Sequence, residues 1–127
     1  MASAISSGAL PELPADLPAQ VDAALHEDIG SGDVTARLVP EAQRVRGSVI
    51  TREAAVLCGR AWAEETFRRL DARVELKWHA GDGASLTAQQ VVFDIAGPAR
   101  AVLSGERTAL NFLQLLSATA TVTRRFV

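Results

Sequence analysis

Arg107 is the residue whose position most strongly suggests chemistry. Ser104 and Gly105 are expected to introduce a long final helix, which would place Arg107 in the first turn of that helix. A cation there faces the positive end of the helix macrodipole and costs about 0.3–1 kcal/mol, whereas an anionic ligand is favoured at the same place. Arg107 is therefore a candidate anion-binding residue. The alternative is an ion pair with Glu106 or another local acid.

The other reactive residue types do not complete a catalytic centre or a metal site. The acidic residues of Glu27–Thr35 (EDIGSGDVT) lack the ligand spacing of a calcium loop, so turn capping is favoured over metal binding. His26 and His79 are not spaced to bind zinc together with Cys58. Cys58 lies in an apolar stretch, where burial would raise the pKa of its thiol and leave it unreactive. The sequence predicts no metal site in this chain.

The amino-terminal part of the chain has the pattern of one short helix. Leu17, Val21 and Leu25 are spaced by four residues, and Gly30 stands where a helix would end. The glycines and aspartates of Glu27–Thr35 predict a turn-rich loop at this point.

The middle of the chain has the pattern of short strands joined by tight turns. Val74, Leu76 and Trp78 alternate with polar residues, as expected for a strand with one buried face. The expected strands and the helix between them are Val45–Ile50, Ala54–Leu57, the helix Ala61–Leu70, the strand from Val74 to Trp78, Gln90–Ile95 and Ala99–Leu103. An antiparallel sheet covered by helices, an α+β domain, follows from this order.

The final helix is apolar around nearly its whole circumference between Ala109 and Leu116. A sheet can cover only one side of such a helix, so we expect another domain or subunit to cover the rest. The chain ends at Val127 without a helix stop signal, so we expect the final helix to be interrupted there and not completed. We expect a flexible leader at 1–15, a sandwich domain at 16–104 and a helix at 105–127 that leads into a further domain.

Composition excludes several function classes. The chain has 127 residues, of which 48% are apolar, enough for one domain with a real core. With 22% charged residues and a net charge of −2, nucleic acid is an unexpected partner. No apolar run approaches the roughly 20 residues of a membrane span. The single cysteine and the lack of a secretory signal predict a cytoplasmic protein.

Two motifs resemble those of the quinolinate phosphoribosyltransferase family: EDIGSGDVT at Glu27–Thr35 and GERTALNFLQLLSATATVTRRFV at Gly105–Val127. REAAVLCG at Arg52–Gly59 and GDGASL at Gly81–Leu86 also resemble that family, so the likeness runs from about Leu17 to the end. Ala118 departs from the pattern, because family members commonly have glycine at this position.

The resemblance implies the amino-terminal sandwich domain, with a hammerhead-like sheet, of an enzyme whose α/β barrel is not in this chain. Such enzymes convert quinolinate and phosphoribosyl pyrophosphate to nicotinate mononucleotide, pyrophosphate and carbon dioxide in NAD biosynthesis, and Mg²⁺ accompanies the pyrophosphate donor. By this resemblance, Arg107 would contact quinolinate in the neighbouring subunit of a homodimer, which could assemble further into a hexamer. The chain alone would be inactive.

Two alternatives remain open at this stage. One is a paralogue with the same fold that acts on another acceptor. The other is a non-catalytic carrier or interaction module, since hammerhead-like sheets resemble the domains that carry biotin or lipoate on a hairpin lysine. The only lysine, Lys77, falls instead within an alternating strand, and the Gly81–Gly83 turn has none.

Overall fold

The computed structural model describes the backbone of residues 13–125, and the side chains of that range except 29–37 and 125. Most of the expected leader therefore lies outside the described residues. The elements are, in order, α2 (Leu17–Arg37), β1 (Arg44–Ile50), β2 (Ala55–Val56), α3 (Arg60–Leu70), β3 (Glu75–Trp78), β4 (Ser85–Leu86), β5 (Val91–Pro98) and α4 (Ala99–Arg125). Within this described part, no helix is long and apolar enough to cross a bilayer.

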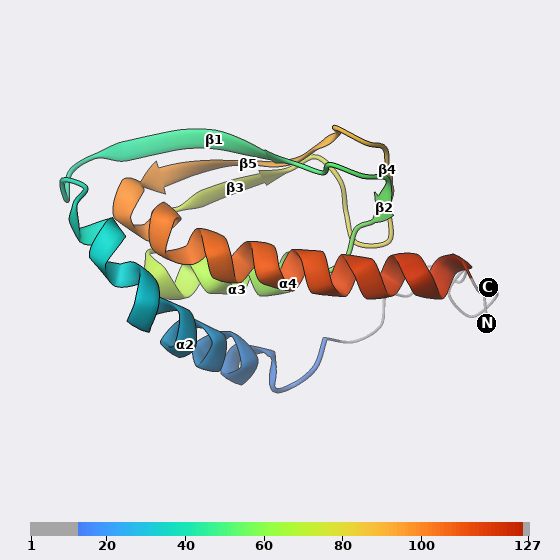
Figure 1. Ribbon diagram of the computed structural model, residues 1–127, viewed down its shortest axis with the longest axis horizontal. Coiled ribbons are helices and arrows are strands. Elements are labelled where there is room, and N and C mark those ends of the chain that lie inside the picture. Colours follow the sequence, from blue (N-terminus) through green and yellow to red (C-terminus); the bar gives the residue numbers. More distant parts are fainter. Residues whose placement is uncertain (1–12, 126–127) are drawn as a thin grey trace.

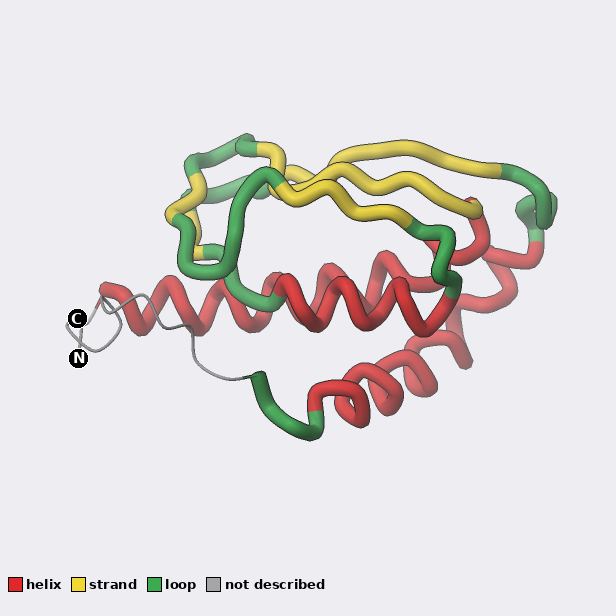
Figure 2. Tube along the Cα trace, turned by 180° about the vertical axis from the view of Figure 1, so that it is seen from behind, coloured by secondary structure: helices red, strands yellow, loops and turns green. Residues whose placement is uncertain are grey.

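A three-stranded antiparallel sheet with the order β1-β5-β3 forms one layer, and α3 and α4 lie side by side beneath it (Figures 1 and 2). A second sheet, β2 with β4, lies near one end of the first, and α2 packs on the far side of the helix layer. This arrangement confirms the α+β class and the antiparallel sheet covered by helices.

The central strand β5 carries the core residues of the sheet. Phe93 is 1% exposed and pairs in register with Trp78 of β3, and the two rings stand 4.7 Å apart. Leu76 is paired with Ile95 on the same inner face, while Lys77 is exposed. The period-two pattern of β3 is thus confirmed, because its apolar side chains face the helices.

A separate apolar cluster holds α2 against the helix layer. Leu17, Val21 and Leu25 are all buried, and they share this cluster with Trp62 of α3. Phe112 of α4 packs against the same group. The four-residue spacing therefore predicted the buried face of α2 correctly.

The turn-rich loop expected at Glu27–Thr35 is wrong, because the α2 backbone stays helical as far as Arg37. Glycine inside a helix costs about 1 kcal/mol relative to alanine, a penalty that tertiary contacts can offset. One such contact is the 2.5 Å hydrogen bond that Asp28 of α2 accepts from Thr108 of α4. A helix tied to its neighbour at this point need not end at Gly30.

The strand expected at Ala99–Leu103 is also wrong, because these residues form the start of α4. Ala99 and Val102, three residues apart, are buried at 1% and 7% exposure, whereas Leu103 is 41% exposed, as expected for a helix with one buried face. Gly97 and Pro98 are the last residues of β5, and a Cβ on Gly97 would lie 2.9 Å from the Val74 Cα. Arg107 is consequently the ninth residue of α4, beyond the first turn where the macrodipole acts.

Gly105, expected to interrupt the chain before the helix, lies inside α4 at its closest approach to α3. A Cβ built on Gly105 would stand 2.7 Å from Leu70 Cδ1 and 2.8 Å from Phe67 Cε1. Real Cβ atoms do not approach other atoms so closely. The missing side chain lets the two helices pack together under the sheet.

Hydroxyl groups of α4 serve as hydrogen-bond partners for the strand β2. Thr121 Oγ1 accepts from the Val56 backbone N–H at 2.9 Å. Ser117 Oγ accepts from the Cys58 N–H and donates to the Cys58 carbonyl, both at 3.0 Å. Val56 of β2 and Cys58, two residues further along the chain, thus meet two residues of α4 that are four apart. The helix α4 supplies the hydrogen bonds that a neighbouring strand would otherwise supply.

We predict that Gly105→Ala lowers the free energy of unfolding by about 1–3 kcal/mol, because Phe67 and Leu70 must shift to admit the methyl group. Gly47→Ala is the control, since no atom lies within 4 Å of a Cβ at Gly47. Urea unfolding of both variants measures the difference. A Gly105→Ala variant as stable as the wild type would contradict the close-approach account.

We predict that Thr121→Val lowers the free energy of unfolding by about 1–2 kcal/mol, because the part-buried Val56 N–H loses its acceptor. Thr123→Val is the matched control, since the exposed Thr123 hydroxyl bonds only the Thr119 carbonyl of its own helix. Equal effects of the two changes on the thermal midpoint would argue against the capping of β2 by α4.

Candidate functional site

Arg107 lies exposed on the face of α4 that turns away from α3. The two residues from Gly105 to Arg107 correspond to a rotation of about 200° around the helix. Since Gly105 faces Phe67 and Leu70 of α3, Arg107 lies on the opposite side of α4, and it is exposed. The side chain is therefore presented to the surroundings of the domain.

Glu106, the acid next to Arg107 in the sequence, does not form an ion pair with it. Within the described part of the chain, Arg107 makes no hydrogen bond and no salt bridge, with Glu106 or with any other residue. No described residue accepts a hydrogen bond from the five N–H donors of its guanidinium. By contrast, Arg69 and Arg73 are each paired with carboxylates.

The free face of α4 also carries apolar side chains. Leu103, Leu115 and Val122 are 41%, 67% and 51% exposed. The expectation that only the sheet covers this helix needs correction, because Phe112 and Leu116 pack against the apolar cluster of α2. What remains uncovered is a narrower stripe, and Arg107 lies within it.

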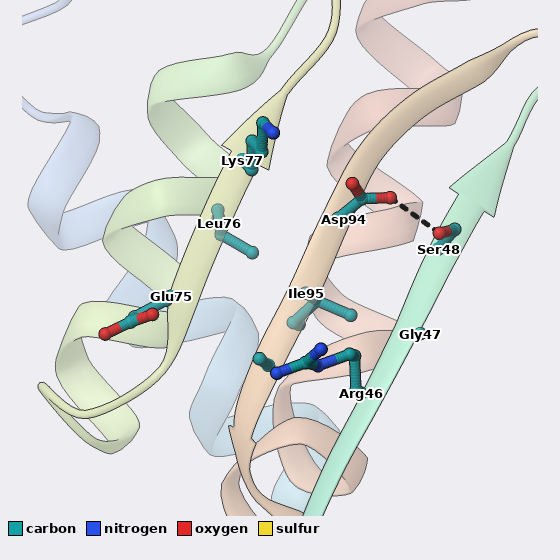
Figure 3. Close-up of a pocket in the computed structure, with 9 residues that line it drawn as sticks. Arg46, Gly47, Ser48, Glu75, Leu76, Lys77, Asp94 and Ile95 are labelled. Carbon is teal, nitrogen blue, oxygen red and sulfur yellow. Dashed lines mark hydrogen bonds between the residues drawn. The ribbon is translucent and has the colours of Figure 1, made fainter.

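A shallow groove of about 480 Å³ lies on the outer face of the sheet (Figure 3). Ser48 Oγ donates to Asp94 Oδ1 at 2.6 Å, and His79 Nε2 lies 2.8 Å from Asp94 Oδ2. Both contacts lower the pKa of Asp94, and the hydrogen bond from Ser48 has the larger effect. Because the Asp94 carboxylate stands between the Ser48 hydroxyl and the His79 imidazole, the imidazole does not contact Ser48, and the arrangement is not that of a Ser-His-Asp triad. The cluster ties β1, β5 and the end of β3 together.

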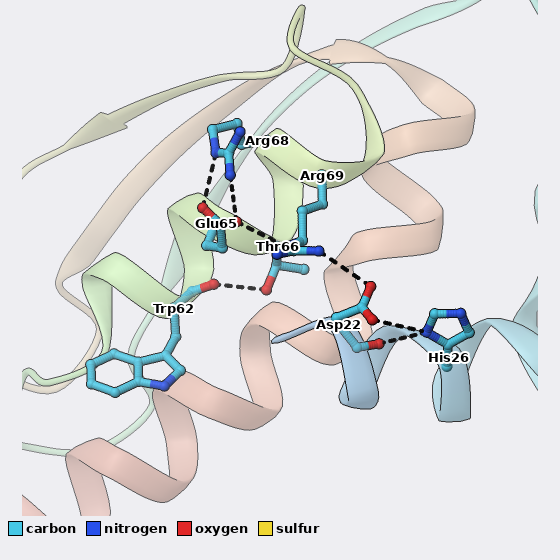
Figure 4. Close-up of polar contacts among 7 residues, drawn as sticks. All are labelled: Asp22, His26, Trp62, Glu65, Thr66, Arg68 and Arg69. Atoms are coloured by element: carbon cyan, nitrogen blue, oxygen red, sulfur yellow. Dashed lines mark hydrogen bonds and ion pairs between the residues drawn. The ribbon is translucent and has the colours of Figure 1, made fainter. Parts of the chain in front are cut away.

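A second polar cluster joins α2 to α3 (Figure 4). Arg69 donates to Glu65 at 2.8 Å and to Asp22 of α2 at 3.2 Å. Arg68 also donates to Glu65, and this hydrogen bond is the main cause of the lowered pKa of that carboxyl. Exposed ion pairs of this kind contribute at most about 1 kcal/mol each. The cluster orients α2 and offers no free group for chemistry.

The remaining reactive residues stay apart from Arg107. Cys58 is half-buried two residues after β2, and burial raises the pKa of its thiol, as expected for an unreactive cysteine. His26 contacts the Asp22 carbonyl on α2, far from His79 in sequence and in the fold. Among the residues that the structure describes, no three acidic, histidine or cysteine side chains are grouped to hold a metal ion.

The contact between Asp28 and Thr108 is a feature of the site that sequence reasoning missed. Asp28 was expected to cap a turn, and Thr108 was given no role. Thr108 is 1% exposed, adjoins Arg107 and donates to Asp28 across the α2–α4 interface. A signal was present, because the two residues belong to the two motifs EDIGSGDVT and GERTALN.

Comparison with known proteins agrees with these motifs. The model of the quinolinate phosphoribosyl transferase N-terminal domain matches residues 33–117. A probable carboxylating nicotinate-nucleotide pyrophosphorylase of Bacillus subtilis is 39% identical over 101 residues, which cover 80% of this chain and 35% of that protein. Its Synechocystis counterpart is 38% identical over 103 residues, again 35% of its length. The chain thus spans about a third of these relatives.

Solved structures show the same fold. The nicotinate-nucleotide pyrophosphorylase of Francisella tularensis matches with a TM-score of 0.84 and 38% identity, over 90% of this chain and 41% of that one. The enzyme of the same name from Ehrlichia chaffeensis matches with a TM-score of 0.81 and 30% identity, over 91% and 42%. From its motifs, its fold and these similarities, the chain belongs to the quinolinate phosphoribosyltransferase family and represents the N-terminal domain of that family.

Proposed function

We propose that this domain works as part of an enzyme that converts quinolinate and phosphoribosyl pyrophosphate to nicotinate mononucleotide, pyrophosphate and carbon dioxide. The names of the relatives, carboxylating nicotinate-nucleotide pyrophosphorylases, support this reaction. Because the chain spans 35% of those relatives, the proposal assigns most of the active site to a barrel domain outside it. The 127-residue chain is then inactive by itself.

Arg107 is proposed to bind quinolinate in the neighbouring subunit. The observation that carries this role is a guanidinium that is exposed on a packed helix and unpaired among the described residues. A planar guanidinium can donate two parallel hydrogen bonds to one carboxylate, and quinolinate has two carboxylates. The support is the free donor set rather than the macrodipole, since Arg107 lies beyond the first turn of α4.

A homodimer is the proposed assembly, and a higher oligomer is compatible with it. Leu103, Leu115 and Val122 form an apolar stripe on the face that carries Arg107, and burial of that stripe favours contact with another surface. A subunit that covers the stripe would receive Arg107 at the same time. We place the enzyme in the cytoplasm, on the basis of the single cysteine Cys58; plant relatives have names that indicate chloroplast or mitochondrion.

The Mg²⁺ that accompanies phosphoribosyl pyrophosphate in the family is not assigned to this domain. The described residues offer no group of three carboxylate, imidazole or thiolate ligands. Mg²⁺ is usually held by one or two carboxylates together with substrate phosphates. The described residues do not fit a dedicated metal site, and no step is derived through one.

The alternatives are less well supported. Lys77 lies within β3, paired in register with Asp94, and not on a hairpin tip where a carried group could swing. A paralogue that acts on another acceptor would have this same fold, so only its acceptor substrate would distinguish it from a quinolinate enzyme. The use of quinolinate by the complete enzyme is the test of that distinction.

We predict that Arg107→Ala, in the enzyme that joins this domain to its barrel, lowers kcat/KM for quinolinate by about 10- to 150-fold through lost charged hydrogen bonds. The KM for phosphoribosyl pyrophosphate should change little. Arg107→Lys should be intermediate, because lysine keeps the charge without the planar fork. Arg52→Ala is the control, since Arg52 is exposed in a loop. An unaltered quinolinate profile for Arg107→Ala would refute the assignment.

We further predict recovery of activity when the Arg107→Ala enzyme is mixed with a variant inactivated in the barrel. A mixed dimer would contain one site with both an intact barrel and an intact arginine from its neighbour. Up to about a quarter of the sites should recover on random exchange. Steady-state assays after demonstrated subunit exchange measure this, and the absence of recovery would rule out donation across the interface.

A further inference from the structure

We propose that Asp28 is a positioning residue for Arg107, which it holds in place through the hydroxyl of Thr108; this rests on the proposed quinolinate role of Arg107. Thr108 Oγ1 donates to Asp28 Oδ2 at 2.5 Å, and the two residues are 80 positions apart in sequence. The hydrogen bond joins α2 directly to the turn of α4 that carries Arg107.

Asp28 occupies a position on α2 where an apolar residue would be expected. Leu17, Val21 and Leu25 are buried at spacings of four, and Asp28, three residues further, continues the same face. Its partner Thr108 is 1% exposed. A polar pair in such an interface stabilises no more than apolar side chains of the same size, because both groups lose water on burial. The pair adds specificity instead of stability. A hydrogen bond fixes the position of one helix along the other, whereas apolar contacts alone would allow the two helices to slide.

The location of the bond explains why the register matters. At Gly105, α4 packs closely against α3, and at Thr108 it is hydrogen-bonded to α2. One turn of α4 is therefore in contact with both neighbouring helices. Arg107 lies between these two attachment points and projects from the free face. A reacting group displaced by about 1 Å can lose about 100-fold in rate, so small movements of this turn are costly. Asp28 does not contact the substrate in this account and acts only through the placement of Arg107.

The test is a double-mutant cycle on kcat/KM for quinolinate in the enzyme that joins this domain to its barrel. Thr108→Val removes only the hydroxyl, and Asp28→Ala removes the acceptor. Each should lower kcat/KM about tenfold in the wild-type background and less than about twofold in the Arg107→Ala background, where no guanidinium is left to position. Asp28→Asn keeps an acceptor oxygen and should restore most of the activity.

Asp22→Ala is the matched control, because Asp22 joins α2 to α3 rather than to α4. It should leave quinolinate kinetics within about twofold of the wild type. Equal losses from Thr108→Val in both backgrounds would show a merely structural role and overturn the proposal, as would wild-type kinetics for both Thr108→Val and Asp28→Ala. If Arg107→Ala has no effect on quinolinate kinetics, the proposed function of Arg107 is refuted. If the Arg107→Ala enzyme is impaired but the cycle shows no coupling with Thr108 or Asp28, only the positioning role of Asp28 is refuted. Thermal midpoints of all variants separate misfolding from loss of position.

Discussion

The close approach of α4 to α3 at Gly105 is the constraint on which the rest of the domain depends. Because Gly105 has no side chain, Phe67 and Leu70 pack directly against the helix backbone. This contact places α3 and α4 side by side beneath β5, whose inner face fills the space above them with Phe93. A bulkier residue at this position would push the helices apart, and the sheet would lose the continuous apolar surface on which it rests.

The same helix organises both ends of the molecule. At one end its residues Ser117 and Thr121 complete the hydrogen bonding of β2, and at the other Thr108 holds α2. Polar residues of α4 thus make the connections to neighbouring elements, while its apolar residues Ala109 and Leu113 enter the core. Arg107, by contrast, is exposed and makes no hydrogen bond or ion pair with the described residues. An arginine left free on so well-connected a helix is suited to binding a partner or a ligand from outside the domain.

Sequence patterns predicted the elements whose spacing is unambiguous. The alternation of Leu76 and Trp78 predicted the inner face of β3, and Leu17 with Val21 predicted the buried face of α2. The run Ala99–Leu103 was misassigned because a short apolar stretch fits a strand or a buried helix equally well. Gly105 was taken for a break because the side chains that require a glycine there, Phe67 and Leu70 of α3, are distant in the sequence and meet it only in the fold. Arg107 was selected for a position in the first turn that it does not have, so its proposed role now rests on the family motif and on its exposure.

The central claim is that Arg107 of one subunit reaches the acid substrate bound by another. A structure of the complete enzyme with quinolinate bound measures this most directly, as the distance between the Arg107 guanidinium nitrogens and the substrate carboxylate oxygens. The account predicts a separation of about 2.7–2.9 Å, with the arginine contributed by the subunit that does not hold the substrate in its barrel. A guanidinium pointing into solvent, or paired with a carboxylate of its own chain away from the substrate, would contradict it.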